Sequence, residues 1–144
     1  MSLPNPYAQY RQNSIETATP ARMVVMLYDG AIRFLTQALA AMAAKRYAEQ
    51  SQLIGKAQSI IAHLHDTLNP ETGRAFAASL LGIYTALLRT LTEANVKNQP
   101  GPVEEAITIL RELRETWAEV NRQCQEVDRP CQSAGSGSRE LVAA

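Results

Sequence analysis

The stretch that decides the fold is MVVMLYDGAIRFL, residues 23–35. An Asp-Gly pair between two apolar runs is a strong signal for a β-hairpin with a type I′ turn, because both turn residues must accept a positive φ. The apolar residues here also recur three and four apart, which is the period of a helix. A helix would place Asp29 and Gly30 in its interior, where glycine costs about 1 kcal/mol relative to alanine. The choice between these two structures decides the fold class.

The flanking sequence favours the helix. One apolar stripe runs from Met23 to Met42 in steps of three and four, and a second runs beside it from Val24 to Leu39. A hairpin would need alternation of apolar and polar residues, which VVMLY and AIRFL lack. The run also continues through the alanine-rich TQALAAMAAK, well beyond the length of a strand. A stripe of this width is typical of a helix buried between two neighbours.

The start of this helix has its own signal in TATPAR. Thr19 can cap the helix, and Pro20 fits the first helical position because the N–H that proline lacks has no partner there. The sequence therefore predicts a helix over residues 20–44. Before it lie residues 1–18, which are polar, carry two prolines and show no sustained period, so we expect a mobile N-terminal arm.

Three further helices are predicted from the same period, over residues 47–68, 71–96 and 103–127. NPETG ends the second, and NQPGP separates the third from the fourth, which we expect to begin after Pro102. Asn95 near the end of the third suits a C-terminal cap. Four amphipathic helices with short connections predict an all-α, antiparallel four-helix bundle over residues 19–128, and the Gly/Ser-rich residues 129–144 predict a disordered tail.

Composition excludes several classes of function. Lysine plus arginine and aspartate plus glutamate number 14 each, so no basic excess points to nucleic acid or to an anionic membrane. No uninterrupted apolar run approaches the roughly 20 residues that span a bilayer, and the N-terminus lacks the pattern of a signal peptide. We therefore expect one cytoplasmic domain with no nucleic-acid or membrane partner.

Catalytic and metal-binding patterns are also missing from the sequence. Cys124 and Cys131 have a spacing that matches no common zinc or redox motif. His63 and His65 are two residues apart on a predicted helix, so they point to different sides and cannot serve one site. No Glu-x-x-His pattern occurs. We expect no enzyme activity, no metal and no cofactor, with a histidine phosphotransfer domain as a weak alternative.

The opening stretch and its flanking residues resemble a known protein family. NPYAQYRQNSIETATPARMVVMLYDGAIRFLTQAL resembles the start of the FliS-type flagellar export chaperones, which carry an N-terminal tyrosine, a Thr-Ala-Ser/Thr-Pro cap and a Leu-Tyr/Phe-Asp-Gly-Ala stretch. LGIYTALLRTLTEAN is similar to the third helix of that family, and ILRELRETWAEV, which contains Trp117, to the fourth. The resemblance covers residues 5–121.

This resemblance implies a cytoplasmic bundle that binds the disordered C-terminal region of flagellin, prevents premature polymerisation and delivers flagellin to the flagellar type III export gate. Other flagellar regulators are further partners that it would allow. A catalytically empty bundle with surplus apolar surface agrees, because capture of a helix in a groove needs only an apolar groove. A self-associating bundle, whose surplus apolar face forms a homodimer, remains the main alternative.

Two sets of residues are candidates for binding the flagellin segment. Tyr7 and Tyr10 stand with Ile15 in the polar arm, so we expect the arm to cover part of the groove and to move on binding; Tyr7 aligns with the tyrosine of the family. The groove itself is predicted from the first and third helices: Met23, Leu27, Tyr28, Ile32, Tyr84, Leu88 and Leu91. The expected structural residues are Thr19, Pro20, Asp29, Gly30, Asn95 and Trp117.

Overall fold

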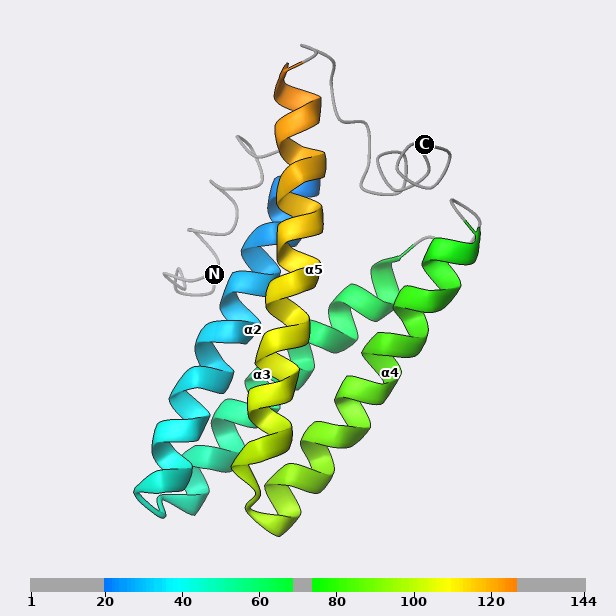
Figure 1. Cartoon of the computed structure of the whole chain (residues 1–144). Coiled ribbons are helices and arrows are strands. Elements are labelled where there is room, and N and C mark those ends of the chain that lie inside the picture. Colours follow the sequence, from blue (N-terminus) through cyan, green and yellow to red (C-terminus); the bar gives the residue numbers. More distant parts are fainter. Residues whose placement is uncertain (1–19, 69–73, 127–144) are drawn as a thin grey trace, which may run out of the picture.

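The computed structural model describes residues 20–68 and 74–126, which form four helices. They are α2 (Pro20–Ala43), α3 (Tyr47–Thr67), α4 (Arg74–Lys97) and α5 (Pro100–Glu126). Consecutive helices run in opposite directions (Figure 1). The predicted all-α four-helix bundle is therefore confirmed. The expected arm, the cap at Thr19 and the expected tail lie outside the described residues.

The opening stretch is helical throughout. α2 begins at Pro20 and continues through Asp29 and Gly30 without a break. By length and composition alone, this helix is long and apolar enough to cross a membrane. The sequence did not indicate this, because its apolar residues do not form one uninterrupted run. The helix packs in the bundle instead, because one face supplies core residues from Ala21 to Met42 and contacts both α3 and α5.

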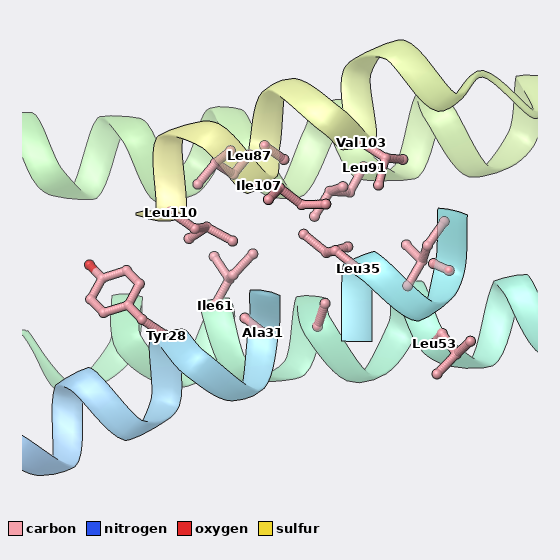
Figure 2. Close-up of a cluster of buried hydrophobic side chains, with 14 of the residues drawn as sticks. Tyr28, Ala31, Leu35, Leu53, Ile61, Leu87, Leu91, Val103, Ile107 and Leu110 are labelled. Atoms are coloured by element: carbon pink, nitrogen blue, oxygen red, sulfur yellow. The ribbon is translucent and has the colours of Figure 1, made fainter. Parts of the chain in front are cut away.

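The four helices form a ring around one core. α2 and α4 each contact α3 and α5, whereas the diagonal pairs do not approach through their backbones. Figure 2 shows the centre of this core, where Leu35 and Ile61 face Leu91 and Ile107 from the opposite pair of helices. Leu35 and Leu91 are fully buried. Diagonal contacts are therefore made by side chains alone.

The connection between α2 and α3 is a tight helix end. The Arg46 N–H donates to the carbonyl of Ala41 at 2.9 Å, and the Lys45 N–H donates to that of Met42 at 3.0 Å. This pair of hydrogen bonds is the Schellman motif, in which the first residue after the helix end adopts the left-handed backbone conformation. Lys45 takes that role with a φ of 58°, so α3 can begin at Tyr47 without a longer loop.

α4 also ends at a residue with a positive φ, and here one prediction was wrong. The residue with positive φ is Asn98 (54°), and the Gln99 N–H donates to the carbonyl of Ala94 at 3.0 Å. Asn95 lies within the helix and is not its cap. Its side-chain oxygen instead accepts a hydrogen bond from Nε2 of Gln50 at 2.9 Å. Gln50 is the one buried polar residue among those described, so Asn95 joins α4 to the start of α3.

α5 begins three residues earlier than predicted, at Pro100 and not after Pro102. Both prolines lie in the first turn, where backbone N–H groups have no helical partner and proline is tolerated. α4 begins at Arg74, and the residues before it, 69–73, lie outside the description. α2 and α3 begin where predicted, and the C-terminal end of each helix differs from the prediction by one residue.

Candidate functional site

Two tyrosines from the predicted groove meet across the bundle. Tyr28 on α2 and Tyr84 on α4 are 0% and 1% exposed, and their hydroxyl oxygens are 2.5 Å apart in a hydrogen bond. Their rings are tilted, with centroids 6.5 Å apart. Since α2 and α4 are diagonal neighbours, this bond joins helices that have no backbone contact. The pair is a polar contact within an apolar core.

Burial controls the ionisation of this pair. Loss of hydration raises the pKa of Tyr28 to about 12, although the hydrogen bond with Tyr84 and the nearby Trp117 indole act in the opposite direction. Burial and the neighbouring Tyr28 also raise the pKa of Tyr84. Nε1 of Trp117 makes no hydrogen bond of normal geometry among the described residues. Both tyrosines are therefore neutral at physiological pH.

The structure divides the predicted groove residues into two groups. Tyr28, Tyr84 and Leu91 are fully buried and form part of the core. The others are partly exposed: Met23, Leu27, Ile32 and Leu88. Tyr7, Tyr10 and Ile15 lie outside the described residues. The exposed candidates thus stand mainly on α2, and the buried ones belong to the core.

Asp29 serves a contact that the sequence did not reveal. Nε of Arg114 on α5 donates to its carboxylate at 2.6 Å, and Nη2 lies 3.5 Å from the second oxygen. Such a forked arginine–carboxylate pair is geometrically specific. The two residues are 85 positions apart and both are partly exposed, so only the folded bundle identifies them as partners. On α5 itself, Arg122 donates to Glu119.

Gly30 faces α3. A β-carbon added at Gly30 would lie 3.3 Å from Cδ1 of Ile60. That distance is tighter than an ordinary contact, and it involves the end of a flexible side chain, which can shift by a few tenths of an ångström. The absent side chain therefore lets α2 approach α3 closely, which accounts for a glycine inside a helix.

We predict that glycine-to-alanine substitutions at Gly30, Gly55 and Gly82 will differ in their effect on the free energy of unfolding. Gly55 and Gly82 are also helical, but added β-carbons there would meet nothing within 4 Å. Alanine at either position should stabilise the fold by about 0.5–1 kcal/mol through helix propensity. Gly30→Ala should give little or none of this gain because Ile60 must move. Urea unfolding followed by circular dichroism measures the difference, and an equal gain at all three positions would contradict the close approach.

A further group on the same side of α2 was missed by sequence reasoning. Phe34 is half-buried, and two cations approach its ring: Cζ of Arg33 lies 5.4 Å and Nζ of Lys56 5.5 Å from the centroid. Both distances are within the range of cation–π interactions. Phe34 lies one helical turn beyond Gly30, so Met23, Leu27, Gly30 and Phe34 form a strip, here called the α2 strip, along the α3 side. Every member is partly exposed.

The remaining titratable candidates are dispersed. His63 is exposed, and His65 contacts the carboxylate of Asp66 next to it in sequence. Within residues 20–68 and 74–126, no group of three or more histidine, cysteine, aspartate or glutamate side chains is placed to hold a metal ion. The His65–Asp66 contact, like that of Arg122 with Glu119, lies within one helix. The polar side-chain contacts that join one helix to another include the pairs Tyr28–Tyr84, Asp29–Arg114, Gln50–Asn95 and Gln58–Thr92.

Comparison with known proteins assigns this bundle to a class. The chain is 34% identical over 120 residues to the flagellar secretion chaperone FliS of Bacillus subtilis, an alignment that covers 83% of this chain and 89% of the relative. It is 35% identical over 113 residues to the flagellar secretion chaperone FliSB of Pseudomonas aeruginosa, with 76% and 90% covered. The corresponding protein of Campylobacter jejuni is 30% identical over 115 residues, with 80% and 90% covered. The class is that of flagellar secretion chaperones.

The family is equally clear. The family model for the flagellar protein FliS matches residues 3–124, which include all four helices except the last two residues of α5. The chain belongs to the FliS family, and the resemblance found in the opening stretch is confirmed. The matched region includes Tyr28, Asp29 and Gly30, which supply the cross-bundle bond, the pair with Arg114 and the close approach to α3.

Proposed function

We propose that this protein binds the disordered C-terminal region of flagellin in the cytoplasm, prevents its premature polymerisation and delivers it to the flagellar type III export gate. The observation that carries the proposal is the FliS family match over residues 3–124. The relatives are named flagellar secretion chaperones, and the partner of such a chaperone is an exported flagellar protein. No cofactor, nucleic acid or membrane takes part, and other flagellar regulators are further partners.

The α2 strip and its neighbours supply a suitable surface. An amphipathic segment can bury its apolar residues against partly exposed side chains on one face of a folded bundle. Met23 and Leu27 lie in the strip. Ile32 is partly exposed elsewhere on α2, and Leu88 is partly exposed on α4, which has no backbone contact with α2. The ordering of a disordered segment offsets part of the energy of apolar contact, which keeps binding reversible. Reversible binding suits release at the export gate.

Two roles complete the proposed site. Tyr28, Tyr84 and Leu91 act from within the core, where they fix the positions of α2 and α4 under the bound segment. Tyr7, Tyr10 and Ile15 of the arm cover part of the groove in the free protein and move when flagellin binds. The arm thus protects apolar surface until a client arrives.

We predict that an equimolar amount of this protein will prevent seeded polymerisation of monomeric flagellin from the same genome. Light scattering should stay near its starting value, because the segment needed for assembly is covered. A flagellin that lacks its C-terminal region should not form the complex on size-exclusion chromatography. Removal of residues 1–16 should change the concentration needed for inhibition, since the arm and flagellin share a surface.

Two outcomes would count against these proposals separately. Normal polymerisation at a several-fold excess of the full chain would overturn the chaperone function. Inhibition that is identical with and without residues 1–16 would leave that function intact and overturn the covering role of the arm.

A further inference from the structure

Phe34 and the two cations beside it form a distinct feature on the outside of α2 and α3. The ring is half-buried, and Arg33 and Lys56 are both exposed, one from each helix. Two positive groups within 5.5 Å of one ring centroid repel each other, although the ring attracts each of them. An anion beside the ring and its two cations would relieve the repulsion.

The helices themselves provide no such anion. α2 and α3 carry three carboxylates, and each already contacts another base. Asp29 contacts Arg114, Glu49 contacts Arg46 at 3.7 Å, and Asp66 contacts His65 at 3.1 Å. In the part of the chain that the structure describes, neither Arg33 nor Lys56 is paired with a carboxylate. Because both cations are also exposed, each can take a negative group from another molecule.

The floor beside these cations is apolar. Gly30 lies one turn before Phe34, and Cδ1 of Ile60 fills the space under its missing side chain. Long helical side chains lean toward the helix N-terminus, which is the direction of Gly30 from Phe34. A ligand at this place meets two cations and an apolar surface together. That combination fits a carboxylate on an amphipathic peptide better than a free inorganic anion, which would gain nothing from the apolar floor.

We propose that Arg33 and Lys56 bind an aspartate or glutamate side chain of the flagellin segment, with an apolar residue of that segment against Phe34. This inference rests on the proposed function and extends it, because it requires a client with an acidic residue next to an apolar one. The two cations set the register of the segment along the α2 strip. They also make binding depend on salt, since exposed charge pairs are screened at physiological ionic strength.

The test compares two charge-reversed double variants of the full chain. Arg33→Glu with Lys56→Glu removes the proposed site, whereas Arg89→Glu with Arg111→Glu changes the net charge equally at exposed arginines of α4 and α5. A dye-labelled C-terminal segment of the flagellin from the same genome is titrated with each protein and followed by fluorescence anisotropy. The titrations are run at 50 and 300 mM salt, and circular dichroism verifies that both variants are folded.

The site variant should raise Kd at least tenfold at 50 mM salt and reduce its salt dependence, and the control should change Kd less than threefold. A segment whose acidic residues are replaced by lysine should bind the site variant better than the wild-type protein. Equal shifts in both variants would overturn the carboxylate site and leave the chaperone function standing. A segment that does not bind the wild-type protein would overturn the proposed function and this inference with it.

Discussion

Raising the pH from 8 to 11 should cost the fold about 3 kcal/mol through Tyr28 and Tyr84 alone. In the unfolded chain both hydroxyls titrate near pH 10, whereas burial raises the pKa of Tyr28 to about 12 and that of Tyr84 as well. A tyrosine whose pKa is higher in the folded than in the unfolded state stabilises the fold. This contribution is fully present below pH 10 and is lost as the pH rises toward and through 12. Between pH 10 and its raised folded pKa, each tyrosine lowers the free energy of unfolding by about 1.4 kcal/mol per pH unit, so the two together cost about 3 kcal/mol by pH 11.

The matched control is the double variant Tyr28→Phe, Tyr84→Phe. It keeps both rings in the core and removes both hydroxyls, so its stability at pH 8 should stay close to that of the wild type. A single Tyr28→Phe change should instead cost about 1–2 kcal/mol, because it leaves the Tyr84 hydroxyl buried without its partner. Urea unfolding at pH 8 and 11 measures all three proteins. Parallel losses in wild type and double variant would contradict the buried pair.

Leu35→Ala at the centre of the bundle should destabilise the fold by about 3–4 kcal/mol. The side chain of Leu35 is fully buried, with 0% of its surface accessible to solvent. It points from α2 toward residues of the facing helices (Figure 2). Removal of such a side chain loses its transfer energy and leaves a cavity that the neighbouring helices fill only in part. A loss of that size is a large fraction of the stability of a small domain.

Leu39→Ala is the control on the same helix. Leu39 packs against the core but remains partly exposed, so its truncation should cost about half as much or less. Thermal and urea unfolding of the two variants measure the difference by circular dichroism. Equal losses, or a loss under 1 kcal/mol at Leu35, would show that the core is not organised around this position.

The sequence predicted best those features that depend on residues close together in the chain. The period of three and four around Asp29 and Gly30, together with the alanine-rich continuation, was enough to predict a helix in place of a hairpin. Pro20 was recognisable as a first helical residue for the same kind of reason. The error at Pro100 was also local: a Pro-Gly-Pro sequence was taken as a break, although prolines are accepted in the first turn of a helix.

The contacts that join distant segments could not be predicted in this way. Tyr28 and Tyr84 are 56 residues apart, and a helical period marks both as apolar-face residues without distinguishing a groove from a core. Arg114 belongs to a row of alternating charges on α5, any of which could have met Asp29. Asn95 was wrongly predicted as a helix cap, because its actual partner, Gln50, depends on how α3 packs on α4. These pairings follow from tertiary structure alone.

The most direct test of the central claim is a calorimetric titration of the full chain with the C-terminal segment of flagellin from the same genome, with sedimentation analysis of the free protein. We predict saturable binding of one segment per chain, and none for an equally long segment from the middle of flagellin. An absence of heat with the C-terminal segment, together with a tight homodimer in sedimentation, would contradict the chaperone function and favour a self-associating bundle.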